Sequence, residues 1–328
     1  MSGTRAYYIA FVGFLAAFVL TACSEAPSRP LRVGLDAWPG FALLFIAQDK
    51  GFFEEQGVEV ELVELSSLAD VRRAFERGQI DGMATSLIEV LEASRNGPRN
   101  PVIALMTDYS NGGDVVLAST GIDNTASLKG RRVGIEPGTL NRFVLTRALE
   151  KAGLRIDDVE VVNIPQQAMV EVAAMGKVDA LVTYPPVSTE IERSNLMRPV
   201  FSSAEIPGEV ADVVSFDREL FTTRSADIAA FSRAWGQVVE YVRAEPEAAY
   251  ALVSRHIDMS PDELATTYEG IEIISADREA QFVSPNGPLV DGFHTLSEIL
   301  WPDDRYEEAD WADKFFSRRA KVAWGGTE

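Results

Sequence analysis

The sequence predicts an α/β protein of two lobes, each a mostly parallel sheet flanked by helices, with a helical extension at its C-terminal end. Strand and helix patterns alternate from Leu31 to about Phe216. Short sequence motifs, called words below, recur about one hundred residues apart, and only helical patterns follow from about Arg218. Alternating strands and helices favour parallel strands joined by helical crossovers. The chain of 328 residues, 46% apolar and 24% charged, is long enough for two compact lobes.

The first repeat begins with three predicted strands and two intervening helices. Alternating apolar residues predict strands over residues 31–35 and 58–65, and residues 80–85 predict a third. Helical patterns fill residues 41–50 and 67–77, and a glycine follows each of them. This order is typical of a sheet with helical crossovers.

The same order returns further along the chain with matching words. Each match alone is weak, but three in sequence at offsets of 100, 101 and 98 residues indicate two related units. The pairs are Arg32-Val33-Gly34-Leu35-Asp36 with Arg132-Val133-Gly134-Ile135-Glu136, Val58-Glu59-Val60 with Val159-Glu160-Val161, and Gly78-Gln79-Ile80-Asp81-Gly82 with Gly176-Lys177-Val178-Asp179-Ala180. Two copies do not make a solenoid, so the repeat predicts two similar lobes.

The C-terminal part reads as helical. Helical patterns cover residues 226–245, 246–256, 260–271 and 289–300. We expect these helices to form no third sheet and to return to the first lobe, which makes that lobe discontinuous in sequence.

The N-terminal end carries an export signal. A basic stretch ends at Arg5, an apolar run covers residues 6–20, and Leu20-Thr21-Ala22-Cys23 follows at once. The run is short for a membrane-spanning helix but fits a secretory signal peptide. The last four residues resemble the bacterial lipobox, which implies that residues 1–22 are removed and that Cys23 is lipidated. Residues 23–30 then form a flexible tether.

The charge balance limits the partners. The formal net charge is -20, and such a surface repels nucleic acid and anionic membrane faces. We therefore expect no nucleic-acid partner. Cys23 is the only cysteine, which excludes an intramolecular disulfide.

Several motifs carry a resemblance to a known family. They are Val33-Gly34-Leu35-x-x-Trp38-Pro39-Gly40, Ala47-Gln48-Asp49-Lys50-Gly51-Phe52-Phe53, Asp108-Tyr109-Ser110-Asn111-Gly112-Gly113-Asp114, Leu128-Lys129-Gly130-Arg131-Arg132-Val133-Gly134, and Val178-Asp179-Ala180-Leu181-Val182-Thr183-Tyr184-Pro185-Pro186. With them the chain resembles the substrate-binding proteins of ABC transporters of the nitrate, sulfonate and taurine type, within the thiamine-pyrimidine-precursor-binding-like superfamily. The resemblance implies the periplasmic-binding-protein type II fold, a small-molecule solute, an ABC transporter permease as partner, and no cofactor.

The resemblance also implies an organisation in space. Residues 31–114 and 215–328 would form lobe 1, residues 115–214 lobe 2, and the chain would cross between them at Asp114–Val116 and Val213–Ser215. We expect a monomer held at a bacterial membrane by its lipid, in the periplasm or at the cell surface.

The loops after the strands supply the candidate ligand-binding residues, because ligands of open α/β sheets lie outside the carboxyl ends of the strands. These loops hold turn formers, hydroxyls and aromatic rings, which suit a small solute. The candidates are Trp38, Pro39, Gly40, Thr85, Ser86, Gly138, Thr139 and Tyr184. Five of them have an alternative role: Trp38 could pack between the lobes, and Thr85, Ser86, Gly138 and Thr139 could cap helices.

Asp114, Asp212 and Tyr109 complete the candidate set. Asp114 and Asp212 stand beside apolar strand residues. Carboxylates near a closing cleft suit a cationic or amine ligand, and aromatic faces such as Trp38 and Tyr109 favour one as well. Hydrogen bonding to the backbone at the hinge is the alternative role for both acids.

Two other functions compete with transport. A ligand-binding sensor that reports to a membrane receptor would need the same cleft. An enzyme on the same fold is disfavoured, because related thiamine-pyrimidine synthases use a cysteine-rich stretch and histidines, whereas this chain holds one cysteine and only His256 and His294. No metal-ligand cluster, phosphate loop or nucleophile elbow appears in the sequence, so we expect no metal site and no catalytic residue.

Overall fold

The structure is a computed structural model that describes residues 29–275 and 288–300. The predicted signal peptide, Cys23 and all but the end of the tether lie outside the described residues. Within these two ranges, no helix combines the length and the apolar character that a membrane span requires.

Two sheets organise the chain from Leu31 onward. The first has the strand order β11-β4-β10-β3-β1-β2, and the second has the order β7-β6-β8-β5-β9. The strands of the first are β1 (Leu31–Leu35), β2 (Val60–Glu64), β3 (Gly82–Ser86), β4 (Pro101–Ser110), β10 (Ala211–Asp217) and β11 (Ile271–Ile273). The strands of the second are β5 (Val115–Ala118), β6 (Arg132–Ile135), β7 (Glu160–Asn163), β8 (Ala180–Thr183) and β9 (Arg198–Ser202). We call each sheet with its helices the first lobe and the second lobe.

Both sheets are mixed, where the sequence predicted mostly parallel strands. In the first sheet β1 runs parallel to β2 and β3, but β10 runs antiparallel to β3 and β4. In the second, β6 runs parallel to β7 and β8, but β5 runs antiparallel to β8 and β9. The antiparallel strands adjoin the segments that pass between the lobes, and the chain has to reverse direction there. The short strand β11 also joins the first sheet, within a region predicted to be wholly helical.

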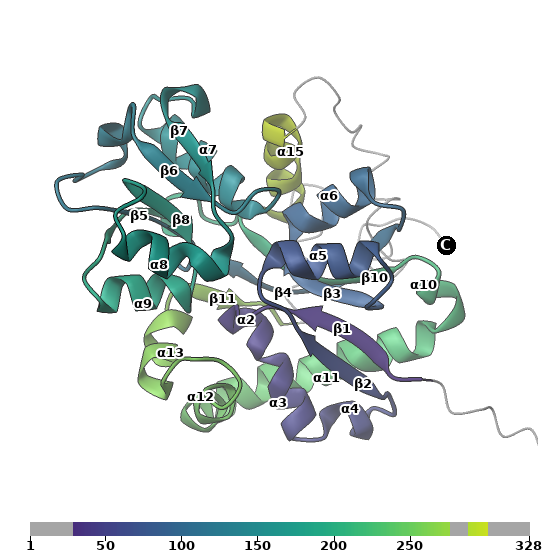
Figure 1. Ribbon diagram of the computed structural model, residues 1–328. Helices are drawn as coiled ribbons and strands as arrows, with labels where there is room; N and C mark the ends of the chain where they lie inside the picture. Colours follow the sequence, from purple (N-terminus) through teal and green to yellow (C-terminus); the bar gives the residue numbers. More distant parts are fainter. Residues whose placement is uncertain (1–28, 276–287, 301–328) are drawn as a thin grey trace, which may run out of the picture. The chain divides into compact units, whose positions relative to one another are not determined.

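The helices cover the two sheets. Figure 1 shows α5 and α6 on one side of the first sheet, with α3, α4 and α11 on the other. The α-helices are α2 (Pro39–Ala42), α3 (Leu44–Asp49), α4 (Phe52–Glu55), α5 (Leu68–Glu76), α6 (Leu87–Asn96), α7 (Leu140–Lys151), α8 (Met169–Ala174), α9 (Val187–Arg193), α10 (Leu220–Thr223), α11 (Ser225–Ala244), α12 (Pro246–Val253), α13 (Pro261–Tyr268) and α15 (Pro288–Leu300). Single 3-10 turns are η1 (Thr125–Leu128), η2 (Ile156–Asp158), η3 (Gln166–Ala168) and η4 (Ser203–Glu205).

The repeated words fold alike. In both lobes the strand of the first word lies between two parallel neighbours, β2 and β3 around β1, and β7 and β8 around β6. The backbone N–H of Arg32 donates to Asp81 at 2.9 Å, and that of Arg132 donates to Asp179 at 2.8 Å. The predicted duplication therefore extends to single hydrogen bonds.

The glycine within each repeated strand has a packing reason. A Cβ on Gly34 would stand 2.5 Å from the Ile80 side chain, and one on Gly134 would stand 2.5 Å from that of Ile164. Apolar side chains from neighbouring segments fill the space in both lobes, so neither position accommodates a larger residue without movement.

The chain passes between the sheets twice. It leaves the first sheet after β4 and enters the second at β5, so the first crossing covers residues 111–114. It returns between β9 and β10, over residues 203–210. The second crossing was expected at Val213–Ser215, but these residues pair within β10 of the first sheet. By sequence alone, an apolar segment that passes between two lobes cannot be distinguished from a buried strand.

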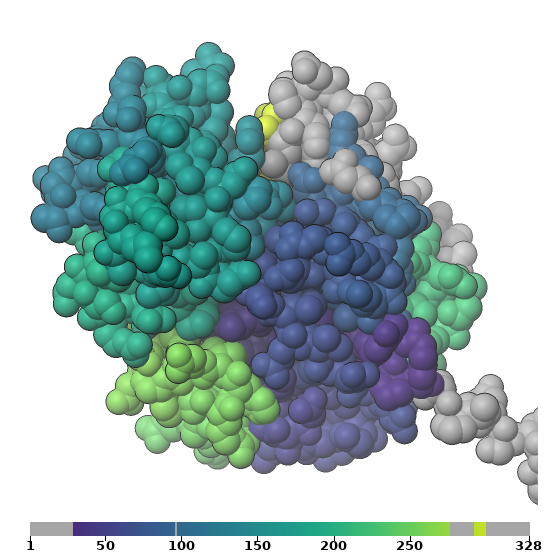
Figure 2. All heavy atoms as spheres, in the orientation of Figure 1, coloured from purple at the N-terminus to yellow at the C-terminus, as the bar shows by residue number. Residues whose placement is uncertain are grey.

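One of the two apolar clusters spans both lobes, and the other lies within the second lobe. One cluster of buried side chains includes Leu35 and Phe216 from the first lobe and Phe143 and Leu145 from the second. On the face shown in Figure 2, the atoms of the second lobe (teal) lie directly against those of the first (purple and blue). The two lobes therefore pack against each other in this structure.

Candidate functional site

Polar contacts join the two lobes at the carboxyl ends of the parallel strands. Asp36 directly follows β1, and Tyr184 directly follows β8. The Tyr184 hydroxyl donates to the Asp36 carboxylate at 2.8 Å, so a donor of the second lobe meets an acceptor of the first. Both side chains are buried, at 4% and 2% exposure.

Trp38 lies beside this pair. Its ring meets that of Tyr184 edge-on, with centroids 6.0 Å apart and planes at 81°. The indole N–H donates to Asp108 at 3.2 Å. A Cβ on Gly113 would stand 2.5 Å from the indole ring, so the first crossing segment packs directly against it. Trp38 is 3% exposed, and it packs between the lobes, which was the alternative to ligand stacking.

Thr85 and Ser86 surround the buried Glu89. Ser86 caps α6, because its hydroxyl accepts from the backbone N–H of Ile88 at 3.3 Å. The same hydroxyl donates to the Glu89 carboxylate, and the Thr85 hydroxyl donates to it at 3.3 Å. The helix-capping alternative for Ser86 is thus observed, together with a second role in holding Glu89.

The N-terminus of α7 meets the same carboxylate from the second lobe. Thr139 caps this helix by accepting from the backbone N–H of Asn141, and Gly138 precedes it with a left-handed φ of 71°. The backbone N–H of Leu140 donates to Glu89 at 3.0 Å. Helix N-termini attract anions. The anion at this one is the chain's own carboxylate.

Asp108 and Asp212 lie directly opposite each other in the first sheet. The β4–β10 register pairs them, and Asp212 also pairs with Ser86 of β3 on its other side. Their carboxyl groups are close enough to share a hydrogen bond. Like charges at paired positions repel, so one of the two must hold a proton when no cation lies between them.

Asp114 ends the first crossing segment. It is 2% exposed, and its backbone N–H donates to the Ser110 hydroxyl at 3.0 Å. That hydroxyl is 2.7 Å from the hydroxyl of Ser203 in the returning segment. The two crossings are therefore tied to each other next to a buried carboxyl, which accords with the hinge-support alternative for Asp114.

Burial disfavours the charged form of each of these acids. It raises the pKa of Asp36 and of Asp108 to about 6, and that of Glu89 and of Asp114 to about 7. Burial, with repulsion from Asp108 added, raises the pKa of Asp212 well above its usual range. The site therefore holds protons that free aspartate and glutamate would lose below neutral pH.

The second lobe contributes one further acid. Glu136 occupies the position that Asp36 has in the first repeat, at the end of β6. Burial raises its pKa, and a hydrogen bond with Ser67 of the first lobe lowers it. The backbone N–H of Gln166 approaches it at 3.5 Å.

Most of the residues predicted from the sequence lie in this cluster, and Tyr109 does not. Strand alternation places the Tyr109 side chain on the other face of β4 from Asp108. Pro39 and Gly40 form the start of α2, where the Pro39 carbonyl accepts from Tyr268 at 2.9 Å. Gly40 packs against the indole N–H of Trp38 and the Asp108 carboxylate. Whether these residues bind a ligand stays a prediction.

Sequence reasoning missed Asp36, Glu89, Asp108 and Glu136. Asp36 and Glu136 could have been found, because each is the last residue of the first repeated word and follows a strand end. Glu89 and Asp108 gave no such signal, since one lies in the first turn of a helix and the other inside a strand.

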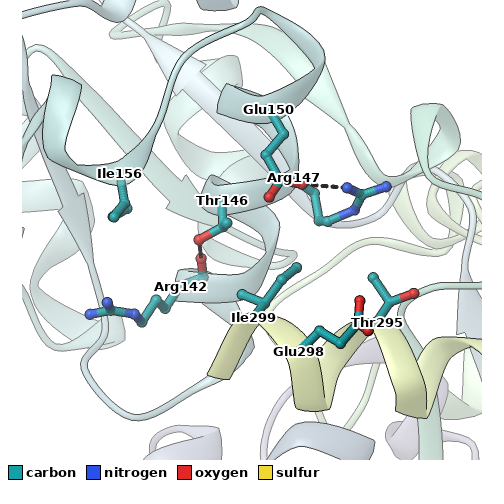
Figure 3. A pocket seen from close by; sticks show the side chains of 8 residues that line it. All are labelled: Arg142, Thr146, Arg147, Glu150, Ile156, Thr295, Glu298 and Ile299. Atoms are coloured by element: carbon teal, nitrogen blue, oxygen red, sulfur yellow. Dashed lines mark hydrogen bonds and ion pairs between the residues drawn. The ribbon is translucent and has the colours of Figure 1, made fainter. Parts of the chain in front are cut away.

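Two open pockets are present, and only the second borders the cluster of buried acids. One of about 420 Å³ lies between α7 and α15, and Figure 3 shows Arg147 there in contact with Glu150. Arg147 also pairs with Glu209 at 2.6 Å, so its charge is already neutralised. The other, of about 560 Å³, lies between α9 and α13 and reaches Gly113 and Pro185, beside Trp38 and Tyr184.

The described residues offer no metal centre. Within residues 29–275 and 288–300, no group of three or more histidine, cysteine, aspartate or glutamate side chains is arranged to hold a metal ion. The buried acids are therefore spread around the lobe contact rather than gathered on one point.

Comparison with known proteins identifies the family. Residues 38–249 match the family described as NMT1/THI5 like. The chain belongs to the NMT1/THI5-like family. A relative from Brucella abortus (strain 2308), named only as a binding protein, is 31% identical over 179 residues, which is 53% of this chain. The chain spans about half the length of that relative, 54%.

A second relative carries an enzyme's name. The Aspergillus parasiticus protein named 4-amino-5-hydroxymethyl-2-methylpyrimidine phosphate synthase is 27% identical over 245 residues, covering 69% of this NMT1/THI5-like chain and 68% of the relative.

Solved structures share the fold. The periplasmic aliphatic sulphonate-binding protein of Escherichia coli superposes with a TM-score of 0.69 at 17% identity, covering 88% of this chain and 97% of its own. The periplasmic nitrate-binding protein of Synechocystis PCC 6803 gives 0.72 at 14% identity, covering 90% and 88%. The predicted family resemblance and the two-lobed periplasmic-binding-protein fold are thus confirmed for this NMT1/THI5-like chain.

Proposed function

We propose that the chain is a lipid-anchored extracytoplasmic solute-binding protein that captures a small molecule between its lobes and delivers it to the permease of an ABC importer. The observation that carries the proposal is the pairing of second-lobe donors with buried first-lobe carboxylates. Tyr184 donates to Asp36, and the α7 N-terminus donates to Glu89. Such contacts exist only when the lobes are closed, so closure and the site are one event.

The similar proteins support the same role. Sulphonate-binding and nitrate-binding periplasmic proteins share the fold, and a Brucella relative is named as a binding protein. We propose that residues 31–114 and 215–328 move as one body and residues 115–214 as the other, apart from the few residues of β10 that precede 215.

Replacement of Trp38 tests the proposal. A ligand that binds the native protein alone raises its melting temperature by mass action. We expect the mature chain to show such a rise with its solute, and we expect Trp38→Ala to lose it through an affinity loss of about 100-fold or more. Thermal shift with a broad set of anions, amines, amino acids and pyrimidines makes the measurement.

Trp38→Phe is the matched control. It keeps a ring against Gly113 and Tyr184 but loses the N–H that donates to Asp108. We expect it to keep a reduced response. If Trp38→Ala binds as tightly as the native chain, Trp38 does not belong to the site.

The lipid anchor rests on Leu20-Thr21-Ala22-Cys23. We propose that Cys23 is acylated and holds the mature chain at a bacterial membrane, as a monomer. Cys23→Ser should abolish palmitate labelling and membrane association in cells. Labelled Cys23→Ser protein would remove the anchor from the proposal.

We also propose that the chain binds its solute without transforming it, although some relatives are named as synthases. His256 supports this, because it stacks on Phe45 and contacts Asp49 among the outer helices of the first lobe, apart from the buried acids. A solute recovered with unchanged mass after prolonged incubation is the expected result, and a new product would favour the enzyme.

A further inference from the structure

We infer that the solute is an organic cation bearing several N–H donors, such as a protonated amine or an amidinium group. The inference rests on the proposed function and names the class of molecule that this same site would take. It follows from the excess of buried carboxyl groups over buried bases, from an acceptor without a partner, and from the occupant of the α7 N-terminus.

The first observation is the charge balance of the lobe contact. Six carboxyl groups are buried there, each at 4% exposure or less. They are Asp36, Glu89, Asp108, Asp114, Glu136 and Asp212. Within the described ranges, no lysine, arginine or histidine forms an ion pair with any of the six. Arg72 and Arg73 lower the pKa of Glu89 and of Glu136 by their charge, but neither pairs with the carboxylate. Buried charges are ordinarily paired, so among the described residues none of the six acids has a direct positive partner.

The second observation is an acceptor without a donor. Asp108 is fully buried, and its Oδ1 accepts from Trp38. Its Oδ2 accepts from no N–H or hydroxyl group among the described atoms, so that without a ligand only a proton shared with Asp212 can satisfy it. The Oε2 atom of Glu136 also has no hydrogen-bond partner among the described atoms, whereas its Oε1 accepts from Gln166. A buried acceptor left unsatisfied is costly. An N–H donor of a ligand would satisfy it.

The third observation excludes an anionic solute. The N-terminus of α7 is the feature of this site best suited to an anion, and Glu89 already accepts there from Leu140. Thr85 and Ser86 hold the Glu89 carboxylate in place from the other side. A nitrate or sulfonate group would have to displace Glu89 and then lie among five further carboxyl groups.

The remaining choice is between a metal ion and an organic cation. The described carboxyl groups do not converge on one point as metal ligands do. Trp38 and Tyr184 lie among them, and aromatic rings bind organic cations through their faces. An extended cation with several N–H groups can reach separate carboxylates, whereas a single metal ion cannot.

Identification of the natural solute is the most direct test. The mature chain is purified from its own cells without denaturation, the bound solute is extracted, and its mass and charge at pH 7 are measured. A cation supports the inference. A neutral or anionic solute overturns it while the solute-binding function stands, so the two failures can be told apart.

A defined panel serves where nothing co-purifies. Agmatine, tyramine and spermidine are the cationic probes, and acetate, nitrate and methanesulfonate are the anionic probes, each titrated by calorimetry. We expect binding from the cationic set alone. Binding of the anionic probes alone overturns the inference. If no probe of either set binds and no solute is extracted, both the inference and the proposed function are overturned.

Asp212→Asn separates binding from folding. Asp212 faces Asp108 from β4, Asp114 from the crossing segment and Glu89 from α6, all of them acids. The variant should lower the affinity for a bound cation by about 100-fold, as loss of a buried charge partner does. It should also raise the melting temperature of the ligand-free chain near neutral pH, because an amide needs no proton to be buried, whereas the Asp212 carboxyl must bind one.

Glu171→Gln is the matched control, since it removes an exposed carboxylate from α8. It should leave both quantities unchanged. Equal affinity in Asp212→Asn and the native chain would overturn the inference, as would an equal loss in the control.

The pH dependence of affinity distinguishes a binding role of the acids from a purely structural role, which would leave it unchanged. A probe that stays charged competes with protons for the carboxyl groups, so its affinity should rise by about 10-fold or more between pH 5 and pH 8. In Asp212→Asn the rise should be smaller. Affinity that falls with pH would contradict a cationic solute.

Discussion

The two lobes share a strand plan but bring different chemistry to the surface where they meet. Gly34 and Gly134 occupy the same place in their sheets, and so do Asp81 and Asp179. At the lobe contact, however, the first lobe supplies most of the buried carboxyl groups. The second supplies the Tyr184 hydroxyl, the backbone amide at the start of α7, and Glu136 alone among the buried acids.

This difference shows which features a duplicated fold retains and which ones it varies. The residues that agree between the repeats lie in the paired strands or directly before them, where neighbouring side chains and backbone hydrogen bonds dictate their identity. The residues that differ lie at strand ends and in crossing segments, which position function without holding the sheet. The first lobe is therefore the acidic half of the site, and the second lobe carries neutral donors that close upon it.

Closure without a solute has an electrostatic cost in this arrangement. Tyr184 and Leu140 neutralise no charge when they donate to Asp36 and Glu89. The acids must bind protons or a cation as water is excluded. We therefore expect proton binding and solute binding to the buried acids each to be coupled to closure of the lobes.

The largest expected effect is a loss of stability with rising pH in the solute-free chain. Folding raises the pKa of Asp36 and Asp108 to about 6 and of Glu89 and Asp114 to about 7. Between the unfolded pKa values near 4 and these folded values, the native state binds more protons, so stability falls as pH rises. We expect the melting temperature to drop by about 10 °C from pH 4.5 to pH 8, measured by calorimetry.

The contributions of the two lobes to this slope can be separated. Asp212→Asn and Glu89→Gln should flatten it clearly, whereas Glu136→Gln should flatten it less, because the first lobe holds more of the buried acids. An equal slope in all three variants would mean that exposed carboxylates set the pH dependence.

The repeated strands and two of the six buried acids, Asp114 and Asp212, were predicted from the sequence, but the other four acids were not. Repeated words placed β1 and β6 correctly and pointed to Trp38 and Tyr184 beyond the strand ends. Asp108 and Asp212 meet only through the register of β4 against β10, two strands more than 100 residues apart in sequence. No local pattern predicts that pairing, and residues 213–215, which were expected to cross between the lobes, pair within β10 instead.

The next effect compares the repeated strands directly. Gly34→Ala and Gly134→Ala would each place a Cβ 2.5 Å from an isoleucine side chain. Overpacking of this kind lowers the free energy of unfolding by about 1 to 3 kcal/mol. Because the surroundings match, we expect the two losses to agree within about 1 kcal/mol in urea unfolding.

Gly236→Ala is the control for these variants. It lies inside α11, and nothing stands within 4 Å of its added Cβ. Alanine in a helix interior should stabilise by about 0.5 to 1 kcal/mol. A large loss in one lobe's glycine variant and none in the other's would break the equivalence of the repeats.

A smaller effect tests the neutral donor of the second lobe. Tyr184→Phe removes the hydroxyl that donates to Asp36 but keeps the ring against Trp38. A hydrogen bond to a charged group contributes about 1.5 kcal/mol, so solute affinity should fall by about 10-fold. Calorimetric titration with the extracted solute measures it. Unchanged affinity would mean that the hydroxyl serves the solute-free closed form alone.

The smallest effect concerns a contact at the rim of the lobes. Arg193 of α9 pairs with Glu263 of α13 at 3.1 Å, and the two side chains are 60% and 25% exposed. Exposed ion pairs contribute at most about 1 kcal/mol, so Arg193→Ala should weaken solute binding by less than about 5-fold. A salt series sharpens the test, because screening weakens this rim pair while it leaves the buried acids largely unaffected. If Arg193→Ala matched Tyr184→Phe in effect, closure would depend on the rim as much as on the buried surface, and the division into an acidic half and a closing half would fail.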